Sequence, residues 1–76
     1  MKRSVPFGEQ MRRRRLQLGL TQVKVSNQMM RTQPFLRTLE LHRLGVLDDQ
    51  DYRGVERALD CRVLDRDADP RIYVPY

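Results

Sequence analysis

Apolar side chains first recur at helical spacing just after the N-terminus. Phe7, Met11 and Leu18 fall on one face of a helix, and Gly19 marks its end because glycine adopts positive φ there without steric cost. Residues 1–6 carry two basic side chains, few apolar ones and a proline. They are therefore predicted to form a flexible arm ahead of this helix.

Two short helices with a tight turn between them are predicted next, over residues 22–29 and 32–40. Each follows a threonine, Thr21 or Thr32, whose hydroxyl can accept a hydrogen bond from a free backbone N–H of the first helical turn. Pro34 lies in the first turn of the second helix, where its missing N–H does no harm. The residues expected to face inward are Val25, Met29, Leu36 and Leu39, with Phe35 beside them.

The helical pattern is interrupted after these helices and then returns. Residues 42–49 contain a glycine and two aspartates and are predicted to form a loop. Asp48 or Asp49 can cap a fourth helix, whose inward residues are Tyr52, Val55 and Leu59. Residues 66–70 favour another loop, and residues 71–74 alternate polar and apolar side chains, which is typical of a short strand. The fold expected is an all-α bundle of four to five short helices, ending in a short β-strand or an unstructured tail.

Composition and charge narrow the class of protein. The chain has 76 residues, 39% of them hydrophobic and none of them Trp, which suits one small helical domain better than a sandwich or barrel. Residues 1–45 contain ten Lys or Arg and two Glu, a net charge of +8. Residues 46–76 contain five Arg and eight acidic residues, a net charge of −3. A basic half is expected where one face meets a polyanion. The alternative is a protein whose charge is merely uneven.

The sequence lacks the residues that several other classes of protein need. Cys61 is the single cysteine and His42 the single histidine, so no disulfide, metal site or other cofactor is expected. His42 has no obvious nucleophile or carboxylate partner in the sequence, which argues against an enzyme. No run is long enough to span a bilayer, and no apolar segment follows the basic N-terminus. A cytoplasmic protein is therefore expected.

The predicted helix pair carries a family resemblance. Residues 15–22, Arg-Leu-Gln-Leu-Gly-Leu-Thr-Gln, are similar to the end of helix 1 and the start of helix 2 in the lambdoid phage repressors and Cro proteins, also called XRE-like. The positions that continue the match without a gap are Val25, Met29, Leu36, Leu39 and Glu40. The resemblance covers residues 7–40 well, residues 41–61 loosely and residues 62–76 not at all. It implies a helix-turn-helix DNA-binding domain over residues 7–61, whose second helix enters the major groove.

The resemblance also implies which residues contact DNA. Gln22 would present its backbone N–H to a phosphate and brace the recognition helix with its side chain. Gln33 would form a bidentate pair with adenine, unless it is an ordinary solvated residue. Phe35 would touch a thymine methyl or else belong to the core, and Thr38 would bond a base or phosphate. The full set is Thr21, Gln22, Arg31, Thr32, Gln33, Phe35, Arg37, Thr38 and Arg43.

Two positions stand apart from these contacts. Arg15 lies four residues after Met11 on the apolar face, where a charge needs a partner, and the family pairs this arginine with a glutamate that here is Glu40. Of the four arginines at positions 12–15, one or two are expected to face DNA. Met30 departs from the family, which usually has glycine there, so the turn must adopt positive φ at some cost or take another geometry.

These observations predict a sequence-specific regulator of transcription that binds double-stranded DNA, of phage repressor/Cro type. A homodimer is expected because a lone domain of this size recognises one half-site, and residues 71–74 would pair with their two-fold mate. The alternatives are a nonspecific nucleic-acid binder and a helix-turn-helix module that binds a protein partner, such as a polymerase subunit, a toxin or another regulator. The apolar residues that such a partner would contact are Leu41, Leu44, Val46 and Leu47.

Overall fold

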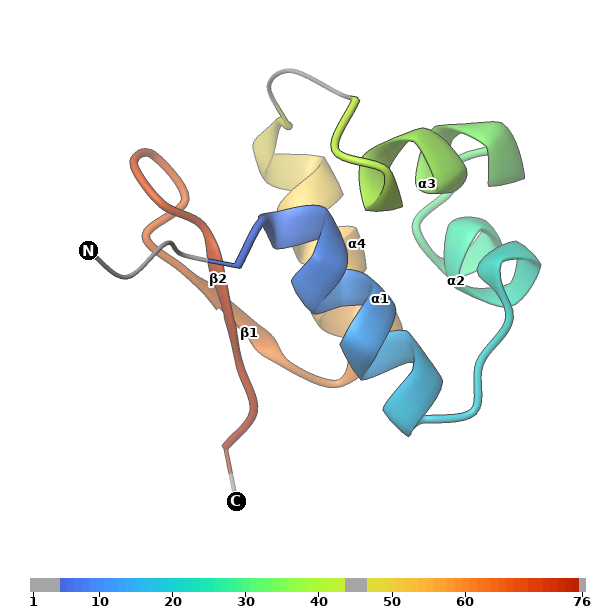
Figure 1. Cartoon of the computed structure of the whole chain (residues 1–76), viewed down its shortest axis with the longest axis horizontal. Coiled ribbons are helices and arrows are strands. Elements are labelled where there is room, and N and C mark those ends of the chain that lie inside the picture. The colour runs from blue at the N-terminus through green and yellow to red at the C-terminus, as the bar shows by residue number, and fades with distance from the viewer. Residues whose placement is uncertain (1–4, 44–46, 76) are drawn as a thin grey trace.

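The computed structural model describes residues 5–43 and 47–75, which form four helices and one two-stranded hairpin (Figure 1). The elements in chain order are α1 (Phe7–Gln17), α2 (Gln22–Gln28), α3 (Gln33–Glu40), α4 (Asp49–Leu59), β1 (Arg62–Leu64) and β2 (Arg71–Tyr73). Helices α1 and α4 lie side by side at the centre, with α2 and α3 on one side and the hairpin on the other. The expected bundle of short helices with a C-terminal strand is confirmed. The arm predicted for residues 1–6 lies mostly outside the described residues.

Helices α1, α2 and α3 all end in the same kind of turn. The residues that adopt left-handed φ after these helices are Gly19 (φ 68°), Met30 (φ 59°) and His42 (φ 62°). The next residue in each case donates its N–H to a carbonyl of the last helical turn, for example Leu20 to Arg15 at 3.0 Å and Arg31 to Ser26 at 2.9 Å. Gly19 thus ends α1 as predicted. Met30 takes the positive φ expected of the turn, which costs a residue with a Cβ about 1–2 kcal/mol.

The helix starts follow local rules. Thr21 accepts a hydrogen bond from the N–H of Lys24 at 3.1 Å, and Thr32 is the N-cap of α3. Asp48 caps α4 through the N–H of Asp51, whose carboxylate in turn accepts from the Asp48 N–H. This reciprocal pair is a capping box, which satisfies two helix-end donors at once. The predicted caps of these three helices are confirmed.

The core lies where all four helices and the hairpin meet. Its buried apolar residues are Met11, Val25, Met29, Leu36, Leu39, Tyr52, Val55, Ala58, Leu59, Cys61 and Val63. The prediction was wrong at Leu18, which is 38% exposed. Leu18 is the C-cap residue beyond the last turn of α1, so it does not continue the face formed by Phe7 and Met11. Leu20 packs against the core instead.

The last strand has a partner within the same chain. Strand β2 pairs antiparallel with β1 of the same chain, and Val63 lies opposite Ile72. Both residues face the core. The pairing of residues 71–74 with a two-fold mate stays a prediction. The outward N–H of Ile72 donates to Gln10 of α1 at 2.8 Å, and that of Val63 donates to Glu56 of α4 at 2.9 Å. Side chains of the two central helices therefore occupy the middle of each hairpin edge.

Candidate nucleic-acid interface

The outward face of α3 brings together several of the residues predicted to contact DNA. Leu36, Leu39 and Glu40 are buried, so helical periodicity turns Gln33 and Arg37 toward solvent. Thr38, partly exposed, lies beside them, and its hydroxyl donates to the Pro34 carbonyl at 2.8 Å. Thr38 therefore faces solvent with its acceptor lone pairs rather than with a free O–H.

An ion pair fixes the end of α3 to the end of α1. Arg15 donates from Nε to Oε2 of Glu40 at 2.8 Å and from Nη2 to Oε1 at 3.0 Å. The Glu40 side chain is 3% exposed, and the amide of Gln22 donates to the same Oε1 at 3.1 Å. Arg15 also donates to the Leu20 carbonyl at 3.0 Å. The pair predicted from the resemblance is thus present, and Gln22 braces α3 through Glu40.

The two threonine caps lie at the starts of α2 and α3. Each Oγ1 accepts from a backbone N–H, Thr21 from Lys24 and Thr32 from Phe35. The hydroxyl protons remain available because a hydroxyl has one donor besides its two lone pairs. Thr21 and Thr32 are both exposed, so each can donate to an approaching anion.

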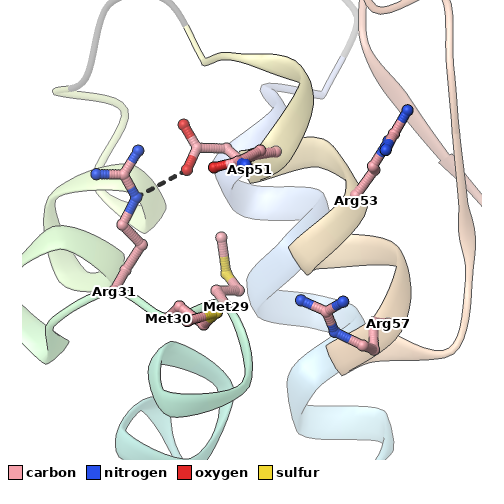
Figure 2. A pocket seen from close by; sticks show the side chains of 7 residues that line it. Met29, Met30, Arg31, Asp51, Arg53 and Arg57 are labelled. Atoms are coloured by element: carbon pink, nitrogen blue, oxygen red, sulfur yellow. Dashed lines mark hydrogen bonds and ion pairs between the residues drawn. The ribbon is translucent and has the colours of Figure 1, made fainter.

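The basic residues around α3 fall into two groups. Arg37 and Arg43 are exposed and form no ion pair with a described residue, as a phosphate contact requires. Arg31 is instead held by Asp51 of α4, with Nε–Oδ1 at 2.8 Å, and lies over the ring of Phe35 at 4.5 Å from its centroid (Figure 2). Asp51 raises the pKa of the Arg31 guanidinium through this hydrogen bond. Arg31 is still 39% exposed, so its contact with a phosphate stays a prediction, and Phe35 is partly buried beneath the pairing.

The four consecutive arginines have different partners. Arg14 donates to the carbonyls of Leu59 and Asp60 at 2.9 and 3.1 Å, so it caps the C-terminus of α4. Arg12 and Arg13 pair with Glu9 on the surface of α1. Together with the partly buried Arg15, this arrangement gives each of the four a partner within the protein.

The exposed surface of α2 and α3 lacks negative charge. Between Thr21 and Arg43, all of which the structure describes, the one acidic residue is Glu40, and it is 5% exposed and paired with Arg15. Lys24, Arg37 and Arg43 are exposed on this segment. The surface is therefore cationic and suited to a polyanion.

Reactive groups are scarce in the described part of the chain. No cluster of three or more potential metal ligands occurs there, and no helix there is long and apolar enough to cross a membrane. His42 is exposed in the turn after α3. Cys61 is buried, and its Sγ lies 3.9 Å from the Val55 carbonyl.

Burial raises the pKa of the Cys61 thiol to about 11, from an ordinary value of 9.0. At pH 8 the folded protein is expected to contain about a hundredfold less thiolate than an ordinary thiol would, and to react slowly with an aromatic disulfide reagent. Because the folded pKa is the higher one, the stability that the neutral thiol contributes is present below pH 9 and is lost as the pH rises toward 11. Labelling rates with and without denaturant measure this, and equal rates would contradict it.

The apolar segment considered as a protein-binding surface is described in part. Leu41 is 50% exposed, whereas Leu47 packs against the core. Leu44 and Val46 lie outside the described residues. The described part thus offers one exposed leucine to a protein partner.

Two residues of this arrangement were not found from the sequence. Asp51 is recognisable as the third residue of a capping box that begins at Asp48, but its bond to Arg31 spans 20 residues and has no local signal. Arg14 was expected only as one of four arginines, because its bond to Leu59 spans 45 residues. Comparison of the chain with models of protein families, with curated proteins and with solved structures finds no match.

Proposed function

We propose that this protein binds double-stranded DNA sequence-specifically and regulates transcription, with α3 in the major groove. The observation that carries the proposal is the cationic surface of residues 21–43, whose one carboxylate is buried against Arg15. Phosphate contacts supply most of the affinity of such proteins, and an exposed acid on the contact face would oppose them. The family resemblance of residues 7–40 points to the same surface.

Gln33 supplies the base contact in this proposal. It is exposed at the first position of α3, and its amide forms no hydrogen bond with a described residue. A glutamine in that position can bond N6 and N7 of adenine as a bidentate pair. Thr38 accepts from a base amino group, and Arg37 and Arg43 contact phosphates. Phe35 contributes mainly to the packing beneath Arg31.

The first experiment is selection of bound sites from random duplex DNA at near-physiological salt. A recovered consensus supports the proposal, and inverted repeats about one helical turn apart would support the homodimer that we also propose. Affinity that falls steeply with salt but shows no consensus would identify a nonspecific binder. Failure to retain any duplex would favour a protein-binding module.

Gln33→Ala is expected to weaken binding to the selected site by about 1–3 kcal/mol and to relax base preference at one position. The reason is the loss of a bidentate contact without a change of charge. Gln17→Ala, at the exposed end of α1, is the matched control and should bind like wild type. Competition titrations with cognate and random duplexes make the measurement. Equal losses on both duplexes would show that Gln33 does not read a base.

A further inference from the structure

Arg31 connects three parts of the fold, α2 through its backbone and α3 and α4 through its side chain. Its backbone N–H closes the end of α2 by donating to the Ser26 carbonyl. Its guanidinium covers the ring of Phe35, in the first turn of α3, and donates to Asp51 in the first turn of α4. A planar guanidinium suits both contacts, because it stacks on an aromatic face and directs its N–H groups in a fixed fork.

Asp51 is a rigid and buried acceptor for this contact. Its side chain is 5% exposed. One carboxylate oxygen accepts from Arg31, while the other accepts from the backbone N–H of Asp48 at 3.2 Å. Asp48 itself lies 3.8 Å from Arg31. The capping box thus holds the carboxylate in place, and Arg31 neutralises it.

A groove opens on this side of the molecule, beside the contact between α2 and α4. Its volume is about 560 Å³, and it lies between the α2–α3 turn and α4. Figure 2 shows Met29 and Met30 between the two sides, Arg53 and Arg57 projecting from α4, and Arg31 reaching toward Asp51. The pair of Arg31 and Asp51 is therefore a direct polar link across the groove from the entry of α3 to α4.

We propose that Arg31 is a positioning residue: its bond to Asp51 clamps the first turn of α3 against α4 and thereby sets the base preference at the position that Gln33 faces. Gln33 follows Arg31 by two residues, so the clamp fixes the backbone from which this glutamine projects. The inference rests on the proposed function, because base preference presupposes DNA binding. It replaces the role of Arg31 as a phosphate contact.

The energetics favour the clamp over a phosphate contact. If Arg31 turned to a phosphate, Asp51 would keep a buried charge without its cationic partner. Leaving a buried carboxylate without its cationic partner is unfavourable. Arg37 and Arg43 can meet phosphates without such a loss, since neither is paired with a described acid.

The clamp is tested first in the free protein, by a double-mutant cycle with Arg31→Met, Asp51→Asn and both together. The two changes break the same interaction, so their effects should not add. The unfolding equilibrium constant of the double variant should be at least about threefold smaller than the value obtained by multiplying the fold-increases of the two single variants. Residual dipolar couplings should show α3 reoriented relative to α4 in each single variant. Additive effects with an unchanged orientation of α3 would overturn the clamp, whether or not the protein binds DNA.

The second test is whether Asp51→Asn strengthens or weakens the binding of DNA. Removing a negative charge alone should strengthen binding to every duplex. The clamp predicts weaker binding to the cognate site instead. Discrimination against a duplex changed at the adenine should fall by about fivefold or more, which is the lower end of what a bidentate base contact supplies. Asp49→Asn is the matched control, because Asp49 pairs with Arg53 and Arg66 rather than Arg31. Tighter binding of both variants would overturn the clamp.

Salt dependence separates the two roles of Arg31. Removing a phosphate contact lowers the slope of log K against log salt by about one. Arg37→Gln should show this loss, whereas Arg31→Met should keep the slope of wild type. A loss of about one for Arg31→Met would make it a phosphate contact and overturn the inference. Wild-type protein without any base preference would instead refute the proposed function, and the cycle in free protein would still decide the clamp.

Discussion

Arg15→Ala is expected to lower the free energy of unfolding by about 3–5 kcal/mol. The substitution leaves the Glu40 carboxylate, 3% exposed, with the amide of Gln22 as its remaining donor, and it removes the donor to the Leu20 carbonyl. A small domain has about 5–15 kcal/mol of stability in total, so this loss is a large share of it.

Chemical denaturation measures this loss, and two further variants serve as its control and its rescue. Arg13→Ala removes a neighbouring arginine that is 62% exposed and paired with Glu9 on the surface, so it should change the free energy by less than about 1 kcal/mol. Replacing Arg15 and Glu40 together with methionine should recover much of the loss, because no buried charge is left unpaired. An Arg15→Ala protein as stable as Arg13→Ala would place the arginine in solvent and contradict the structure.

Gly8→Ala is expected to cost about 3 kcal/mol through overpacking between α1 and α3. An added Cβ at Gly8 would lie 2.0 Å from the carbonyl oxygen of Leu39 and 3.0 Å from Nδ1 of His42. The nearer atom belongs to the backbone and cannot rotate away, so the two helices must separate. The better helix propensity of alanine offsets about 1 kcal/mol of the strain.

Gly54→Ala is the matched control for this prediction, since Gly54 is also a buried glycine within a helix. There the nearest atoms belong to Met29 and lie 3.1–3.3 Å away, which a shift of a few tenths of an ångström relieves. The gain in helix propensity should therefore bring its net effect close to zero. Equal denaturation midpoints for the two variants would show that α1 and α3 do not approach so closely at Gly8.

The sequence predicts the features of this fold that depend on neighbouring residues. Thr21, Thr32 and Asp48 each cap a helix whose first turn follows at once, and Gly19 ends α1 through bonds within one turn. Such contacts depend on residue type and spacing alone. The pairing of Arg15 with Glu40 came from the family resemblance, because nothing local connects positions 25 residues apart.

The sequence fails where partners are distant and chemically interchangeable. Any of the four consecutive arginines has the donors to cap α4, and only packing places Arg14 against Leu59. Arg31 has the length to reach a phosphate or Asp51, and nothing near it in the sequence indicates its bond to Asp51, 20 residues away. Strand β1 has three residues, too few to show an alternating pattern, and it forms because β2 lies opposite.

The two edges of the hairpin relate the stability of α1 and α4 to the tendency of the protein to aggregate. Exposed strand edges template the addition of further strands from other chains. Gln10 and Glu56 occupy the central edge donors of this hairpin, and they come from α1 and α4. Stacking of chains into an extended sheet thus requires Gln10 or Glu56 to release its edge N–H, as happens when α1 or α4 unwinds. Fibril growth is accordingly expected to follow the population of partly unfolded chains rather than protein concentration alone, so that any stabiliser of α1 or α4 also acts as an inhibitor of fibrils.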